Sequence, residues 1–220
     1  MNRNFDHELL ELINNLDYRP KLLLHSCCGP CSSYVISFLT NYFDITVLYY
    51  NPNIEPIDEY LKRKKVQLEL LEELNKINKI DYLDSDYDNE NYHVFIQGYE
   101  KEKEGGKRCQ ICFRKRLEYT SLIAKEKGYD YFGTTLTVSP YKNAILINNI
   151  GFELEKKNQV KWLVSDFKKR DGYKKSIELS KKYNLYRQHY CGCLYSLEES
   201  INGSKNQEVK WRSDITKICY

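Results

Sequence analysis

Seven of the eight cysteines in this 220-residue chain lie in three short motifs. The motifs read C-C-x-x-C, C-x-x-C and C-x-C. Thiolate sulfur binds zinc, iron and iron–sulfur clusters, so closely spaced cysteines point to a metal site rather than to unrelated buried thiols. The grouped residues are Cys27, Cys28, Cys31, Cys109, Cys112, Cys191 and Cys193, whereas Cys219 stands apart and is treated as a spare.

The second and third motifs have spacings that suit a shared ligand. Cys109 and Cys112 are three residues apart, which places both sulfurs on one side of the first turn of a helix. A helix N-terminus favours thiolate, so we expect lowered pKa values for this pair. Cys191 and Cys193 would face the same way in an extended segment, and the glycine between them lets the chain fold closely round a ligand.

The number of thiols separates the kinds of centre. A structural zinc takes four ligands and would leave three thiols over, and a thioredoxin-like redox pair is open for Cys28 with Cys31 or for Cys109 with Cys112. We favour iron–sulfur, because soft all-thiolate ligation with surplus thiols suits a redox site. Neighbouring side chains diverge, so we expect Cys27 and Cys28 to bridge one cluster and a second, separate metal beside it.

Composition sets the class of protein. Hydrophobic residues make up 41% and charged residues 30% of the chain, as in soluble globular proteins. The apolar runs are too short to span a bilayer and the first residues do not resemble a secretory signal, so we expect a cytoplasmic protein with no membrane contact. A reducing compartment argues against structural disulfides.

Hydrophobic periodicity predicts alternating strands and helices. We expect a single domain over 1–220, with an N-terminal helix within 1–20, a core over 21–197 and a C-terminal tail over 198–220. The expected strands are 21–26, 129–137 and 160–167, together with a strand that ends in a loop within 44–54 and a short strand with its exit loop within 79–87. The expected helices are 7–16, 30–39, 57–77, 90–99, 107–128, 141–157 and 173–185.

This order predicts an α/β fold with a parallel sheet of about five strands and helices on both faces. Ligands bind such sheets at the carboxyl ends of the strands. The segments "CCGPC", "TTLTVSPYKN" and "SDFKKRDGY" follow the first, fourth and fifth predicted strands, so all three should lie at the same edge.

Five motifs in the same order resemble the QueH family of epoxyqueuosine reductases. They are "LLLHSCCGPCSSYVI", "RCQICFRKRL", "FGTTLTVSPYKN", "SDFKKRDGY" and "YRQHYCGCLYS", and the resemblance covers roughly residues 21–197. It implies a Rossmann-like fold of the adenine-nucleotide hydrolase-like type. It also implies reduction of epoxyqueuosine to queuosine at the wobble position of tRNA, the last step of queuosine biosynthesis, without cobalamin.

The resemblance shapes the expected cofactors. Fold relatives that use ATP carry a Ser- and Gly-rich phosphate loop after the first strand, whereas this chain has "CCGPC", so we expect no ATP binding. Epoxide reduction needs two electrons and protons, which a [4Fe-4S] cluster and an unidentified electron donor would supply. We expect cluster or bridging ligands from Cys27, Cys28, Cys109, Cys112, Cys191 and Cys193, with a mononuclear iron as the second metal and Cys31 among the metal ligands.

A general acid must protonate the departing oxygen. Candidates near the predicted edge are Tyr141, Asp166, His189 and Tyr190, although Asp166 could instead cap the next helix. His25 ends an apolar strand and is expected to be a buried, hydrogen-bonded imidazole rather than a ligand.

The tRNA anticodon loop would be bound through phosphates and a splayed, stacked base. The net charge is +3, yet residues 161–220 carry 13 Lys and Arg against 7 Asp and Glu. We favour phosphate contacts by Lys168, Lys169 and Arg170, a run that could otherwise simply face solvent. Further candidates are Lys142, Arg114 and Arg116 for phosphate, and Tyr141, Tyr186 and Tyr190 for stacking. Two alternative functions stay open, namely an ATP-using iron–sulfur tRNA thiolase and a zinc-stabilised RNA-binding protein.

Overall fold

Five parallel strands form the sheet that organises the molecule. A computed structural model of the chain describes residues 3–202, and its strand order is β3-β2-β1-β4-β5. The order reverses between β1 and β4, which creates the switch point where α/β sheets bind ligands. The strands are β1 (Lys21–His25), β2 (Asp44–Leu48), β3 (Ile80–Leu83), β4 (Tyr131–Thr134) and β5 (Lys161–Trp162).

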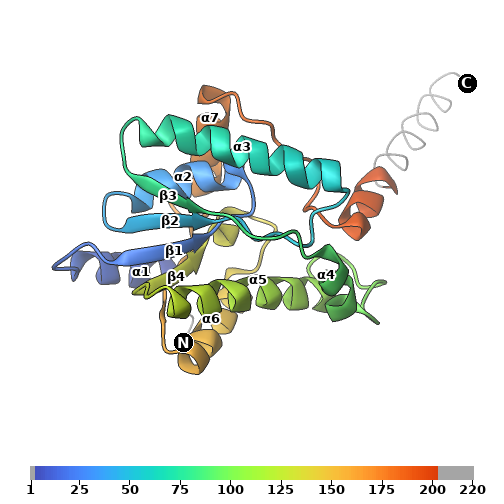
Figure 1. Cartoon of the computed structure of the whole chain (residues 1–220), viewed down its shortest axis with the longest axis horizontal. Coiled ribbons are helices and arrows are strands. Elements are labelled where there is room, and N and C mark those ends of the chain that lie inside the picture. Colours follow the sequence, from blue (N-terminus) through green and yellow to red (C-terminus); the bar gives the residue numbers. More distant parts are fainter. Residues whose placement is uncertain (1–2, 203–220) are drawn as a thin grey trace, which may run out of the picture.

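Helices cover both faces of this sheet (Figure 1). On one face α2, α3 and α7 pack together, and on the other α5 packs against α6, β1 and β4. The α/β prediction with helices on both faces is therefore confirmed. The helices are α1 (Phe5–Asn14), α2 (Gly29–Leu39), α3 (Ile57–Asn75), α4 (Asn89–Ile96), α5 (Lys107–Glu126), α6 (Ala144–Asn158) and α7 (Gly172–Lys182), with a 3₁₀ turn η1 (Leu136–Val138) and a helical segment at 194–202.

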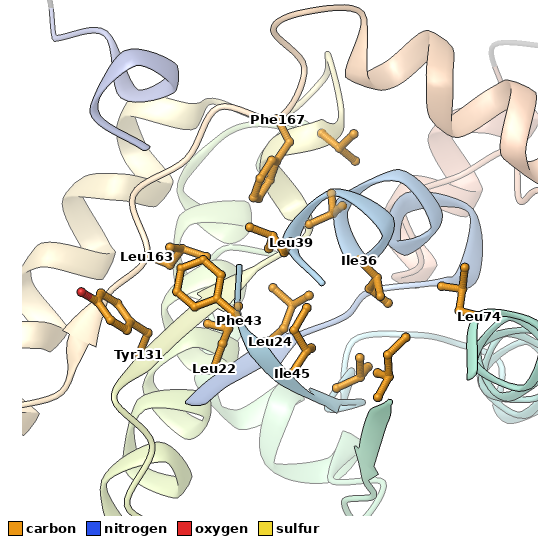
Figure 2. Close-up of a cluster of buried hydrophobic side chains, with 14 of the residues drawn as sticks. Leu22, Leu24, Ile36, Leu39, Phe43, Ile45, Leu74, Tyr131, Leu163 and Phe167 are labelled. Atoms are coloured by element: carbon orange, nitrogen blue, oxygen red, sulfur yellow. The ribbon is translucent and has the colours of Figure 1, made fainter. Parts of the chain in front are cut away.

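The central strand β1 supplies both halves of the core. Leu22 and Leu24 join the cluster under α2 and α3, which Figure 2 shows, whereas Leu23 joins the cluster under α5 and α6. Side chains of a strand alternate between its faces, so an uninterrupted apolar run is what a strand covered on both sides requires.

The fifth strand is shorter than the predicted 160–167. The amide of Leu163 still donates to the Phe132 carbonyl at 2.8 Å, but two residues later the Asn148 side chain replaces the ladder. Its Nδ2 donates to the Ser165 carbonyl at 2.8 Å, and its Oδ1 accepts from the Ser165 amide at 3.1 Å. A side chain thus completes the hydrogen bonds that a longer strand would have made.

Among residues 3–202, no helix combines the length and the apolar character that crossing a membrane requires. The predicted N-terminal helix is present as α1. Most of the predicted C-terminal tail, and Cys219 with it, lies outside the described residues.

Candidate metal centre

The turn between β1 and α2 gathers the first three cysteines. Sγ of Cys27 and Sγ of Cys28 are 3.8 Å apart, and together with Sγ of Cys31 they all lie within 4.8 Å of one another. No other three His, Cys, Asp or Glu side chains in the described part of the chain come as close together. The three residues, called the cysteine trio below, could hold a metal ion.

The expected divergence of Cys27 and Cys28 is wrong. The chain bends at Cys27, and Cys28 caps α2 with an extended backbone of φ −175° and ψ 158°, so both side chains face one space. Hydrogen bonds from Cys28 and Cys31 hold the pKa of Cys27 well below its usual value, while Cys27 raises the pKa of Cys28 to about 12. One shared negative charge on neighbouring sulfurs prepares the trio for metal binding, which requires thiolates.

Two polar side chains support the trio from other segments. Nε2 of Gln188 donates to Sγ of Cys28 at 3.0 Å, and the Thr135 hydroxyl lies 3.7 Å from Sγ of Cys27. Thr135 follows β4, so the carboxyl ends of β1 and β4 meet here as predicted. Hydrogen bonds to sulfur ligands tune a metal centre without coordinating the metal.

His25 has the structural role that the sequence indicated. It is fully buried, with Nδ1 2.8 Å from the Thr134 hydroxyl and Nε2 3.1 Å from the Tyr50 carbonyl. Burial lowers its pKa to about 3, so the imidazole is neutral. Both ring nitrogens are occupied, and His25 is therefore not a metal ligand here.

The other four grouped cysteines meet at the N-terminal end of α5. Cys109 and Cys112 lie in its first turns and Cys193 is also buried, whereas Cys191 is half-buried. Burial, together with the charges of Cys191, Cys193 and Cys109, raises the pKa of Cys112 to about 12. Charges act on one another in this way when they lie in one region of the structure. The four residues are called the cysteine quartet below.

One expectation about the quartet is wrong. The helix N-terminus does not give Cys109 and Cys112 lowered pKa values, because burial raises the pKa of both thiols. The amide of Gly105 does donate to Sγ of Cys109 at 3.2 Å, which opposes the effect of burial without overcoming it. A bound metal would have to displace these protons.

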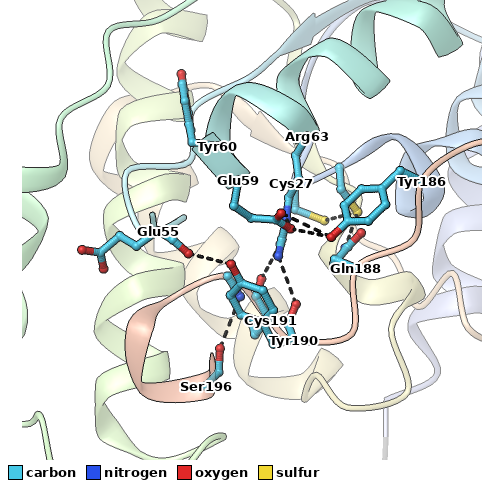
Figure 3. A network of polar contacts seen from close by, with 12 residues as sticks. Cys27, Glu55, Glu59, Tyr60, Arg63, Tyr186, Gln188, Tyr190, Cys191 and Ser196 are labelled. Atoms are coloured by element: carbon cyan, nitrogen blue, oxygen red, sulfur yellow. Dashed lines mark hydrogen bonds and ion pairs between the residues drawn. The ribbon is translucent and has the colours of Figure 1, made fainter. Parts of the chain in front are cut away.

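A buried arginine fixes the chain around Cys191 (Figure 3). Arg63 of α3 is 2% exposed, and its Nη1 donates to the Cys191 carbonyl at 3.0 Å. Its Nη2 lies 3.4 Å from the Tyr190 carbonyl, and its Nε donates to Glu59 at 2.7 Å. Gly192 adopts φ 142° beside this guanidinium, a conformation that side chains disfavour. The C-x-C segment is thus held on a rigid helix.

A cavity of about 520 Å³ opens onto both cysteine groups. Sulfur-bearing residues from the trio and from the quartet lie in its wall together with aromatic and cationic side chains. Its size suits one nucleoside-sized ligand. The lining residues are Cys27, Cys31, Glu104, Arg116, Ser139, Tyr141, Lys142, Tyr173, Arg187, Gln188, His189, Tyr190 and Cys191.

Comparison with known proteins agrees with this arrangement. The family model "Epoxyqueuosine reductase QueH" matches residues 22–199, a span that includes all seven grouped cysteines. The chain belongs to the QueH family. The epoxyqueuosine reductase QueH of Staphylococcus aureus is 44% identical over 216 residues, covering 94% of this chain and 90% of the relative. That of Streptococcus pyogenes is 45% identical over 180 residues (81% and 71%), and that of Thermotoga maritima 36% over 184 residues (81% and 91%).

Three of the four acid candidates of this QueH protein line the cavity. Tyr141 is 80% exposed at its rim, and His189 lies in its wall. Tyr190 also lines it, but its hydroxyl donates to the Glu55 carbonyl at 2.6 Å. Asp166 is not in the lining; it forms an ion pair with Lys168 at 2.8 Å, so the structure does not bring this carboxyl to the cavity.

Three of the six cations predicted to contact phosphate have carboxylate partners. Lys168 pairs with Asp166, and Arg170 pairs with Asp6 at 3.1 Å, whereas Lys169 is exposed. Arg114 pairs with Glu153 at 2.5 Å. Tyr186, a predicted stacking residue, donates to Glu59 and lies outside the cavity. Lys142 and Arg116 are different, because both line the cavity beside the cysteines.

Sequence reasoning missed several residues of the site. Arg63 lies in the predicted helix 57–77 and was not singled out. The available signal was Glu59 four residues before it, a spacing that pairs charges on a helix. The other missed lining residues are Ser139, Tyr173, Arg187 and Gln188, which lie in motifs quoted above but were not singled out, and Glu104, which lies outside all of those motifs.

Proposed function

We propose that this chain reduces the epoxide of epoxyqueuosine in tRNA to the alkene of queuosine, using an iron–sulfur centre. One observation carries the proposal: cysteines of the first and third motifs, far apart in sequence, line one nucleoside-sized cavity at the switch point of the sheet, and the charges of the third motif act on Cys112 of the second. Family membership supports the same activity.

The residues fit a metal centre by their chemistry. All seven grouped thiols are free of disulfide bonds, and they form an all-sulfur donor set that suits iron–sulfur clusters. Two thiolates on one tetrahedral metal at about 2.3 Å would stand about 3.8 Å apart, which is the Cys27–Cys28 separation in the trio. We therefore assign the second metal, a mononuclear iron, to the trio.

The quartet is assigned to a [4Fe-4S] cluster. Such a cluster takes four thiolates on four different irons, so its ligands stand farther apart than ligands of one ion. In the described residues the quartet does not form a set as tight as the trio, although its members repel one another electrostatically. This assignment differs from the expectation from sequence, which gave Cys27 and Cys28 a part in both centres.

The reaction has a fixed balance. Both C–O bonds of the epoxide break, a C=C bond forms, and two electrons with two protons convert the oxygen into water. An iron–sulfur cluster supplies electrons one at a time at low potential. The chain itself must bind the base, exclude bulk water and deliver protons.

The cavity wall provides groups for these tasks. Tyr141, Tyr173 and His189 offer ring faces on which a splayed base can stack. His189 is our preferred proton donor, because it lines the cavity, whereas the Tyr190 hydroxyl is occupied and Asp166 does not line the cavity. Tyr141 is the second candidate.

Lys142 has a place beside the sulfurs. Burial lowers its pKa, but the charges of Cys191, Cys27 and Cys31 outweigh burial and raise it above its usual value. The ammonium group is therefore charged. We assign it to anion binding at the cavity, either to the thiolates or to the tRNA backbone next to the modified base.

ATP has no evident place in this scheme. The position after β1, where fold relatives hold phosphate, carries the sulfurs of the trio and the N-terminus of α2. We propose that turnover needs an electron donor and no nucleotide, and likewise no cobalamin. An ATP-using thiolase would need the nucleotide, so the same assay separates the two functions.

The decisive experiment is anaerobic. The protein is purified without oxygen, its iron and acid-labile sulfide are measured, and it is incubated with dithionite and tRNA that contains epoxyqueuosine. We expect iron with sulfide, and nucleosides that have lost one oxygen atom when analysed by mass spectrometry. Stoichiometric zinc without sulfide would instead favour a zinc-stabilised RNA-binding protein. Turnover that depends on ATP would contradict the proposal.

A further inference from the structure

Arg116 is a buried cation between the two cysteine groups. It lies on α5, one turn after Cys112, and is 2% exposed. Its Nε lies 3.3 Å from the Cys112 carbonyl, which anchors the guanidinium to the quartet. On its other side it lines the cavity together with Cys27, Cys31 and Cys191. Arg116 therefore shares the cavity wall with cysteines of both groups.

This guanidinium lacks a carboxylate partner. Nη2 of Arg116 has no hydrogen-bond partner among the residues the structure describes, and no carboxylate there forms an ion pair with it. The other two fully buried arginines are different, since Arg63 pairs with Glu59 and Arg108 donates to the Glu100 carbonyl and pairs with Glu199. A buried charge without a counter-charge is strongly destabilising, so an anion is expected beside Arg116.

We propose that Arg116 is the counter-cation of the metal–thiolate centres and sets how readily the cluster accepts an electron. The inference rests on the proposed iron–sulfur centre. Thiolates of both groups are the anions in reach, and adding an electron makes such a centre more negative, so a nearby fixed positive charge favours the reduced form.

The electrostatics of the metal-free protein agree with this placement. Burial lowers the pKa of Arg116, yet the charges of Cys112, Cys191 and Cys27 raise it by more. In turn Arg116 opposes the effect of burial on the pKa of Cys112. Arg116 is thus a positioning residue that acts through the sulfurs and not a group that must touch the substrate.

The test measures the reduction potential of the anaerobically loaded, full-length protein. Arg116→Gln removes the charge and keeps a polar side chain, Arg116→Lys keeps the charge, and Lys125→Gln removes an exposed charge from the same helix as a control. At a fixed donor potential we expect the ratio of reduced to oxidised cluster to fall at least tenfold in Arg116→Gln, about 59 mV for a one-electron couple. Arg116→Lys and Lys125→Gln should stay within about threefold of the wild type.

Each result decides the matter. An unchanged potential in Arg116→Gln overturns the inference. If Arg116→Gln does not load iron, Arg116→Lys must load it with a near-wild-type potential; failure of both variants would show that the shape and hydrogen bond of the guanidinium matter and not its charge. A wild-type protein without iron and sulfide would contradict the proposed function itself, which distinguishes that failure from this one.

Discussion

Nε2 of Gln188 donates a hydrogen bond to Sγ of Cys28 over 3.0 Å, although the two residues are 160 positions apart. A hydrogen bond to a charged acceptor contributes about 1.5–3 kcal/mol. We expect Gln188→Leu to weaken metal binding by the trio roughly tenfold while the sulfide content stays unchanged. Competition with a chelator measures the affinity, and the exposed Gln97→Leu is the control. Equal metal affinities in the wild type and in Gln188→Leu would show that Gln188 does not support metal binding by the trio.

The trio and the quartet should respond differently to loss of a sulfur. Because Cys27 and Cys28 face the same space, Cys27→Ser and Cys28→Ser should both deplete the same single iron and leave most of the sulfide. Cys109→Ala or Cys112→Ala should abolish cluster loading, measured as iron and acid-labile sulfide for each protein chain. Cys219→Ala, outside the described residues, should load like the wild type. Unequal metal losses in the two trio variants would restore the bridging arrangement expected from sequence.

Arg63 should be essential for the position of the C-x-C segment. Arg63→Ala leaves the Glu59 carboxylate and two carbonyls without their donor, so we expect the metal-free protein to lose about 3–5 kcal/mol of unfolding free energy. Urea denaturation measures this loss, and reconstitution should show poor cluster loading. The exposed Lys65→Ala, on the same helix, should change stability by less than about 0.5 kcal/mol. A stable Arg63→Ala variant that loads fully would show that the segment is held by other contacts.

His25 gives the fold a defined acid sensitivity. Its pKa falls from 6.5 to about 3 on folding, so between these values the unfolded chain binds more protons than the folded one. The contribution of His25 to stability is fully present above about pH 6.5. As the pH is lowered below this value, the free energy of unfolding should fall by up to about 1.4 kcal/mol for each pH unit. Denaturation of the metal-free protein from pH 4 to 7 tests this. His25→Gln, which cannot take up the proton, should have a shallower slope; parallel slopes would contradict the prediction.

The salt dependence of tRNA binding should separate paired from unpaired cations. If Lys168, Lys169 and Arg170 each contacted a phosphate, replacing all three by alanine would flatten the slope of log affinity against log salt by about two units. Two of these residues already have carboxylate partners, so we expect the triple alanine variant to change it by only about 0.7. Lys142→Ala with Arg187→Ala should change it by about 1.4. A full two-unit change in the triple variant would reinstate the prediction from sequence.

Local patterns were enough to predict the sheet. The run Leu22–Leu24 and the glycine–proline pair after it have one reasonable reading, a buried strand entering a helix, and the structure agrees. The length of the last strand was not predictable in this way. The side chain of Asn148, which lies in α6, takes the hydrogen bonds of the Ser165 backbone that a longer strand would have made. A contact between two segments does not change the hydrophobic periodicity of either segment.

The functional site shows the same contrast between what local sequence predicts and what depends on contacts between segments. The types and spacing of the cysteines predicted a metal site, and the place of the first motif follows from parallel strands sharing one edge. The approach of the second and third motifs to it depends on the tertiary fold. Charge states do not follow, because burial of Cys112 outweighs the helix terminus, and ion pairing removes Lys168 from the expected phosphate contacts. Both effects depend on neighbours supplied by the tertiary fold.

The quartet draws its sulfurs from two places in the chain order, with Cys112 near the middle and Cys191 close to the C-terminal end. During synthesis the first five grouped thiols leave the ribosome well before Cys191 and Cys193. If the quartet holds the cluster, cluster binding can stabilise the fold only after Cys191 and Cys193 have been synthesised. Cluster insertion is then a late step that follows synthesis of the segment with Cys191 and Cys193, which Arg63 already holds in place without a metal.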